Sequence, residues 1–167
     1  MAGLVAEVNF FKVPTKLENA YGVNVGWFED QKYKDDLTIA QVARWQEFGT
    51  KAGVPRRPFM YQAIMKYEKE WMELLKTMVQ RAIDENKNID TALKKFGEKA
   101  KGDIQETILS GSFTPNAPIT VRGGWMKNKA TGKPVYIEGK GFNQPLVDTG
   151  IMVSSIQART DKELLDV

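Results

Sequence analysis

Two glycine–lysine pairs, Gly132-Lys133 and Gly139-Lys140, have the residue types of a phosphate-binding loop. Such a loop also needs a glycine five positions before its second glycine and a serine or threonine after its lysine. Lys127 and Pro134 stand at the first of these positions, and Pro134 and Gly141 at the second. We therefore interpret both pairs as turn glycines.

Paired carboxylates are the second candidate for chemistry, because two or more converging acids can hold magnesium. Glu29-Asp30 and Asp35-Asp36 lie in or beside a loop that also contains lysine, and three further acids lie on a predicted helix. Nothing in their spacing brings them together, so we interpret them as solvated surface. A small enzyme that uses lysine and carboxylates stays open as an alternative function, and magnesium binding near Asp35 and Asp36 would favour it.

The chain contains neither histidine nor cysteine. Histidine is the side chain that titrates near neutrality and is the commonest zinc ligand, and cysteine supplies thiolate nucleophiles and disulfides. Ser-His-Asp catalysis, histidine metallohydrolases and zinc deaminases are therefore excluded. This favours a binding or structural protein over an enzyme, and we expect no cofactor and no metal.

Basic residues are concentrated in one segment, between Gly111 and Val147. Trp125 and Tyr136 lie among them, and Glu138 is the single acid. The segment has the composition of an arm that orders on a neighbouring subunit, which we favour, or of a surface that neutralises phosphates and stacks on bases. A solvated loop is the third interpretation. The cations are Arg122, Lys127, Lys129, Lys133 and Lys140.

A second candidate for binding is the loop that reads Val54-Pro55-Arg56-Arg57-Pro58-Phe59. Its prolines lower the entropy lost on docking, and arginine beside an aromatic residue is frequent at interface hot spots. The alternative is a well-capped helix start, because Pro58 suits a first helical turn.

The elements that position these residues follow from length and periodicity. With 167 residues, 42% of them apolar and 27% charged, the chain is predicted to be one globular domain. The net charge is +3, and charges of both signs are spread along most of the chain. No apolar run approaches the roughly 18 residues of a membrane span. Alternating residues predict two strands within about 4–28, joined as an antiparallel hairpin.

Helices are predicted over about 38–110. Thr38 and Gln41 have capping-box spacing before a short helix, Ile39 to Phe48, with Ile39, Val42, Ala43 and Gln46 on one side. Apolar steps of three and four then predict a long helix, Phe59 to Glu85, and a second from Ile89 that ends at Gly111. The short break between them predicts an antiparallel helical hairpin that covers the sheet, with Gly97 and Gly102 marking a kink or a close contact.

The remaining elements are short. Ile119 to Arg122 and Val135 to Glu138 are predicted as strands of a basic hairpin arm, about 119–140. In the C-terminal region, about 148–160, Asp148 is expected to cap a short helix and Ile156 to Arg159 to form a last strand. The predicted fold class is α+β: a small antiparallel sheet, with a mixed sheet as the alternative, packed by two long antiparallel helices and a short one.

Four motifs, in this order, resemble the phage virion-morphogenesis family of tail-completion or neck proteins. They are Glu47-Phe48-Gly49-Thr50, Val54 to Met60, Pro115 to Thr120, and Pro145 to Gly150 with Ser154-Ser155-Ile156. The resemblance runs from about Val23 to Arg159. The stretch between Arg122 and Gln144 is longer than the short lysine–glycine link typical of that family, so nothing about it is carried over.

The resemblance implies a non-enzymatic structural protein of a tailed phage or prophage, located in the virion and in the host cytoplasm during assembly. Such proteins form a ring, expected to be a hexamer, where the tail tube meets the head and its neighbouring neck proteins. Tail completion, tail terminator, minor tail and head–tail joining roles are not separated. Contact with DNA in the lumen stays open, no membrane is expected, and a nucleic-acid-binding accessory protein using residues 122–140 is the alternative.

Within this interpretation, Glu47 to Phe59 is predicted to lie near a subunit or neck-partner interface, and the basic hairpin to reach a neighbour or the lumen. The interface residues of the loop are Glu47, Pro55, Arg56, Arg57 and Phe59. We expect alanine at Arg57 and Phe59 to leave a folded protomer that no longer completes tails.

Overall fold

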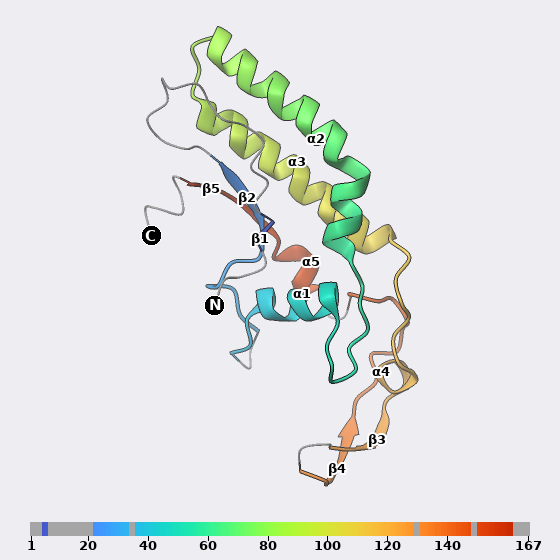
Figure 1. The fold of residues 1–167 in the computed structure, drawn as a ribbon. Helices are drawn as coiled ribbons and strands as arrows, with labels where there is room; N and C mark the ends of the chain where they lie inside the picture. Colours follow the sequence, from blue (N-terminus) through green and yellow to red (C-terminus); the bar gives the residue numbers. More distant parts are fainter. Residues whose placement is uncertain (1–4, 7–21, 34–35, 129–130, 148–149, 162–167) are drawn as a thin grey trace.

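The structure is a computed structural model that describes residues 5–6, 22–33, 36–128, 131–147 and 150–161 (Figure 1). It has the predicted α+β architecture, with two long helices, a three-stranded sheet and a separate two-stranded hairpin. The elements are β1 Val5–Ala6, β2 Val23–Gly26, α1 Ile39–Phe48, α2 Phe59–Asp84, α3 Ile89–Ser110, α4 Pro118–Arg122, β3 Gly124–Lys127, β4 Pro134–Ile137, α5 Ile151–Ser154 and β5 Gln157–Thr160.

The three-stranded sheet joins the two ends of the described chain. Its order is β1-β2-β5, and both pairings are antiparallel, as predicted. The register of β2 with β5 runs from Val23 opposite Thr160 to Gly26 opposite Gln157. The predicted continuation of the first strand over residues 7–13 lies outside the described residues. The early strands and the predicted last strand therefore form one sheet.

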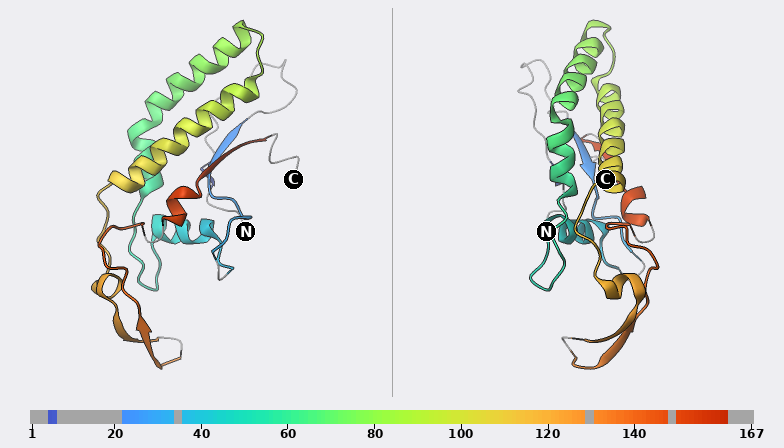
Figure 2. Two further views of the ribbon diagram at one scale, coloured as in Figure 1. Left: turned by 180° about the vertical axis from the view of Figure 1, so that it is seen from behind. Right: turned by 90° about the vertical axis from the view of Figure 1, so that its right-hand side faces the viewer.

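The three predicted helices are confirmed with their ends. Thr38 Oγ1 accepts a hydrogen bond from the Gln41 amide at 3.3 Å, and Asn88 Oδ1 accepts one from the Asp90 amide at 2.9 Å, so each side chain caps its helix. Helices α2 and α3 pack as the predicted antiparallel hairpin (Figures 1 and 2). It is mainly α3 that lies on β2 and β5, with α2 packed against α3.

A polar contact joins the two long helices inside this layer. Trp71 Nε1 of α2 donates to Asp103 Oδ2 of α3 at 2.7 Å. Lys99, one turn before Asp103, lies 2.7 Å from the same carboxylate and 3.0 Å from Glu70 of α2. The buried acid is thus paired and hydrogen-bonded, which is what makes its burial tolerable.

Gly97 lets α3 approach the sheet closely, which is one of the two roles predicted for it. A Cβ at this position would lie 2.7 Å from Ala158 Cβ of β5 and 2.7 Å from Val23 Cγ2 of β2. A Cβ at Gly102 would have none of the described residues within 4 Å, so neither a close contact nor a positive φ accounts for that glycine.

The two glycines therefore give opposite predictions for alanine. Gly97→Ala should lower the free energy of unfolding by about 1–3 kcal/mol, because two methyl groups must move in a packed layer. Gly102→Ala should raise it by up to about 1 kcal/mol, since alanine is the better helix former. Urea unfolding of both variants measures the difference. Equal stabilisation by both alanines would contradict the close packing of α3 on the sheet.

The predicted strand over Ile119 to Arg122 is wrong. These residues belong to α4, which starts at Pro118 and ends at Gly123. Proline fixes the φ angle that a first helical turn needs, and Gly123 adopts φ 74°, which stops the helix. The hairpin strands follow α4 instead, so the first strand is β3 and the arm is shorter than predicted.

Two smaller expectations concern α5 and α1. Gly150 stands directly before α5, and Asp148, the residue expected to cap this helix, lies outside the described residues. The buried side of α1 consists of Ile39, Ala40, Ala43 and Glu47, so Val42 and Gln46 are half-buried. The turn of α5 is fixed by Trp27, whose Nε1 donates to Met152 O at 2.7 Å.

Within the part of the chain that the structure describes, none of the helices has the length and apolar character that crossing a bilayer would require.

Candidate interaction surfaces

Glu47 of α1 lies inside the protomer and caps another helix. Its Oε2 accepts a hydrogen bond from the Met60 amide at 2.9 Å and its Oε1 one from the Tyr61 amide at 3.2 Å. These are amides of the first turn of α2, where Pro58 stands at the cap position and provides no side-chain acceptor. Glu47 therefore supplies from α1 the acceptor that the sequence before α2 lacks.

The electrostatics of Glu47 follow from this position. Burial raises the pKa of its carboxyl, while the bonded amides and the nearby Arg56 act in the opposite direction. Glu47 is 4% exposed, so a partner protein cannot contact its carboxyl in this conformation. The prediction that Glu47 forms an interface is corrected to a role in the α1–α2 junction.

Arg57 is also buried, and its guanidinium joins three segments. Nε donates to Thr114 O at 2.8 Å, Nη1 to Gln46 Oε1 at 2.5 Å, and Nη2 to Pro115 O and Asn116 Oδ1, each at 3.2 Å. None of these acceptors is a carboxylate, and burial lowers the pKa of the guanidinium. Arg57 therefore ties the end of α1 and the loop before α2 to the segment that leads into the arm.

The remaining predicted residues of the loop divide between core and surface. Phe59 is fully buried and meets the Trp27 ring edge to face, with centroids 5.6 Å apart. Pro55 is half-buried and Arg56 is exposed. The side chains of Glu47, Arg57 and Phe59 are thus buried around the start of α2, which agrees with the alternative interpretation of the loop as a helix start. Of the predicted loop residues, Pro55 and Arg56 remain accessible to a partner.

The sequence predicted Glu47 and Arg57 as exposed interface residues, because charged residues are rarely buried. The structure places both side chains inside the protomer. One signal was available: a helix that starts after proline has free amides and no side-chain acceptor of its own, so an acid nearby must supply one. No comparable signal exists for Arg57, because two of its acceptors are the backbone carbonyls of Thr114 and Pro115, 57 and 58 residues away.

The β3–β4 hairpin, called the arm below, projects from the body (Figures 1 and 2). Its two strands are antiparallel and place Trp125 directly opposite Tyr136. The two rings meet at an interplanar angle of 67°, with centroids 5.5 Å apart. Trp125 is nevertheless 72% exposed and Tyr136 57%. The arm thus presents a pair of aromatic rings that the described part of the chain leaves in water.

The base of the arm is held firmly. A Cβ on Gly139 would lie 2.3 Å from Gly123 N, so the two backbones approach more closely than any other residue type allows. Lys140 N donates to Thr120 O at 3.0 Å and Gly141 N to Val121 O at 3.0 Å, which fixes the returning strand to α4. Together with the Arg57 contacts, these bonds form the arm root, residues 114–123 and 139–147.

The predicted cations of the arm are not equivalent. Arg122, Lys127 and Lys133 are exposed, and their side chains form no hydrogen bond or ion pair with the residues the structure describes. Lys140 is half-buried instead, and its Nζ donates to Gln144 O and Val147 O and lies over the Phe142 ring. Lys140 therefore closes the arm root. Lys129 lies outside the described residues.

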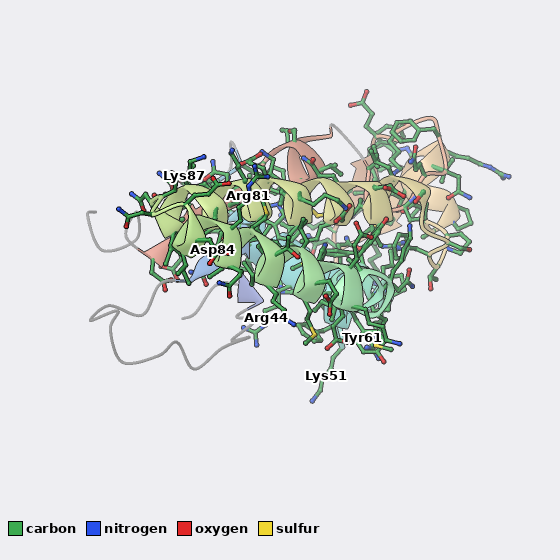
Figure 3. All side chains as sticks on the ribbon, turned by 90° about the horizontal axis from the view of Figure 1, so that it is seen from above. Arg44, Lys51, Tyr61, Arg81, Asp84 and Lys87 are labelled. Atoms are coloured by element: carbon green, nitrogen blue, oxygen red, sulfur yellow. The ribbon has the colours of Figure 1, made fainter. Side chains whose placement is uncertain are left out.

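A second exposed apolar surface lies on the helices, and sequence reasoning missed it. Tyr61, Met65 and Met72 recur at steps of four and seven on α2, and Phe48 ends α1. In Figure 3, Tyr61 and Arg44 lie on the same side of the molecule, beyond α2 as seen from α3. Phe48 is one helical turn after Arg44, so it shares that side. These four apolar residues are called the outer face below.

No cluster of three or more metal-ligating side chains occurs among the described residues. Comparison of the chain with models of known protein families, with curated proteins and with solved structures finds no match.

Proposed function

We propose that this chain is a structural subunit of a tailed-phage or prophage virion, a tail-completion or neck component that assembles as a ring at the head–tail junction. The observation that carries the proposal is the junction around Glu47 and Arg57. It links three of the segments on which the family resemblance depends: the end of α1, the loop before α2 and the residues from Pro115.

Hydrogen bonds in this junction hold the three segments together in the folded protein. Glu47 starts α2, Arg57 binds the carbonyls of Thr114 and Pro115, and α4 begins at Pro118. The same residues fix the direction in which the arm leaves the body. The motifs thus build a support for a projecting arm, as expected for a subunit whose contacts extend beyond its own compact surface.

The partners in this proposal are other copies of the chain, in a ring expected to be a hexamer, and the adjoining neck and tail-tube proteins. The protein would be found in the virion, and in the host cytoplasm during assembly, and would have no catalytic activity. A ring requires two different surfaces on each copy, because a head-to-tail contact closes when its rotation angle suits the symmetry.

The direct test is to inactivate the gene in the phage or prophage that encodes it. Electron microscopy should then show filled heads and tails that remain separate, and the wild-type chain supplied from a plasmid should restore joined particles. Mass spectrometry of purified particles should detect the chain. Normally joined, infective particles formed without it would overturn the proposal.

A second candidate function is nucleic-acid binding by the arm. It is favoured by the exposed Trp125 and Tyr136 beside Lys127 and Lys133, whose side chains form no ion pair with the described residues. Binding of this kind should weaken steeply with salt, because each neutralised phosphate releases counterions. A filter-binding titration that shows no affinity at about 50 mM salt, where such contacts are strong, would remove this candidate.

A further inference from the structure

The geometry points to a contact between copies in which the arm of one protomer docks on the outer face of the next. This inference deepens the proposed function and rests on it for the setting, a closed ring. The contact joins Trp125 and Tyr136 of one copy to Tyr61, Met65 and Met72 of its neighbour. Each copy would offer its arm on one side and its outer face on the other.

The first argument is the exposure of both surfaces. Trp125 is 72% exposed and Met65 62%, and Tyr136 and Tyr61 beside them are exposed as well. Aromatic and methionine side chains are among those enriched in the core of protein interfaces. A two-stranded hairpin is also at best marginally stable in water alone, and gains stability when its apolar side is covered.

The second argument is that the two surfaces lie apart on one chain. The arm leaves the body beyond α4, at the end opposite the α2–α3 turn, in all three ribbon views (Figures 1 and 2). The outer face lies along α1 and α2, and the arm root is fixed by Arg57 and by the close approach of Gly123 and Gly139. The arm that covers an outer face therefore belongs to another copy.

The third argument is the match of chemistry. Methionine side chains adapt their shape to a partner, and their sulfur atoms contact aromatic rings favourably. Glu68 lies within the row between Met65 and Met72, is exposed, and forms no ion pair with the described residues. On the arm, Lys127 follows Trp125 on the same strand face and likewise has no ion-pair partner among those residues. One carboxylate thus meets one ammonium beside the apolar contact.

The borders of the two surfaces also correspond. Arg44 and Lys51 lie on the side of the outer face (Figure 3) and have exposed side chains without a partner among the described residues. The single carboxylate of the arm segment, Glu138, is exposed at its end. An arm that placed Lys127 near Glu68 would therefore also have Glu138 available to pair with Arg44 or Lys51. Together these charge pairs define the orientation of the arm on the outer face.

The test uses two variants of the full chain, each lacking one surface. The arm variant carries Trp125→Ala and Tyr136→Ala, and the face variant carries Met65→Lys and Met72→Lys. Leu109→Ala, on an exposed apolar residue of α3 outside both surfaces, is the matched control. Association should weaken roughly 30-fold or more in each variant, because the arm variant loses two aromatic side chains and the face variant places two charges in an apolar contact. Circular dichroism and urea unfolding check that every variant is folded.

Analytical ultracentrifugation then distinguishes the models by mixing. Each variant alone should be monomeric, while the two mixed should form dimers of one arm variant and one face variant and stop there. This is expected because the mixture retains one intact arm and one intact face per pair. A mixture that stays monomeric at a concentration where the wild type associates, or an arm variant that associates as the wild type does, would overturn the inference.

Photocrosslinking tests the contact when association is too weak for ultracentrifugation to detect. With p-benzoylphenylalanine in place of Trp125, irradiation at the highest soluble concentration, and in particles, should join two chains, and the linked peptide should contain residues 61–72. Links within one chain, to nucleic acid, to residues 1–21 or to no partner would overturn the inference. Particles that contain the chain but give a different linked peptide would sink this contact and leave the proposed function standing.

Discussion

Replacing Phe59 with alanine should lower the free energy of unfolding by about 3–5 kcal/mol, the range for a buried phenylalanine whose cavity only partly collapses. Phe59 is 0% exposed, and its ring packs edge to face on Trp27, which is itself fully buried. Phe59 is also the first residue of α2. The lower free energy of unfolding therefore reflects both a cavity in the core and a weaker attachment of this helix to the sheet.

The matched control is Phe48→Ala, since Phe48 is a phenylalanine at the end of α1 that is 59% exposed. It should change the free energy of unfolding by no more than about 0.5 kcal/mol. Urea or thermal unfolding followed by circular dichroism measures both variants. If Phe59→Ala were as stable as Phe48→Ala, Phe59 would not be part of the core.

Arg57→Met should destabilise the protein by about 2–4 kcal/mol, because it removes a buried hydrogen-bond network. Methionine keeps much of the length of the side chain and removes every donor, so the carbonyl groups of Thr114 and Pro115 and the side chains of Gln46 and Asn116 lose the partner that they have now. A buried polar group without a partner costs about 1–3 kcal/mol. Lysine should restore little, because its ammonium cannot reproduce the planar fork of donors.

Its neighbour provides the control. Arg56 is exposed, and Arg56→Met should stay within about 0.5 kcal/mol of the wild type. Hydrogen exchange adds a local readout, because Arg57→Met should increase exchange at residues 114–123 more than in α3. Equal stability of the two methionine variants would show that the Arg57 hydrogen bonds do not hold the arm root.

These two results would reverse the sequence-based expectation that alanine at Arg57 and Phe59 leaves a folded protomer. The expectation arose because the same residue types, arginine beside an aromatic ring in a proline-rich loop, occur both at interfaces and in buried junctions. Burial decides between the two, and it depends on chain segments far away in sequence. If tails fail to assemble with these variants, loss of folding is a sufficient reason.

The sequence predicted the helices well because their determinants are local. Periodic apolar residues, Thr38 before α1 and Gly111 after α3 set the ends within one residue of those in the structure. The segment Ile119 to Arg122 was mispredicted because β-branched residues favour strands, and the effect of Pro118 on the next turn outweighed that preference. Here a single neighbouring residue decided the conformation.

The candidate surfaces were predicted in part. The composition of the segment pointed to an exposed basic hairpin, and Trp125, Lys127 and Lys133 are exposed there, as is Arg122 at the end of α4. The outer face was not predicted. The helical spacing places Tyr61, Met65 and Met72 outside the apolar stripe of α2, but it does not show whether another element covers them.

The arm root has a mechanical consequence. The chain itself attaches the hairpin to α3 on one side and leads toward α5 on the other, and Gln144 Nε2 adds a hydrogen bond to Leu109 O of α3. The Arg57 guanidinium adds a separate link, from Thr114 and Pro115 to Gln46 of α1. A force on the hairpin would therefore reach the junction between α1 and α2 as well as α3.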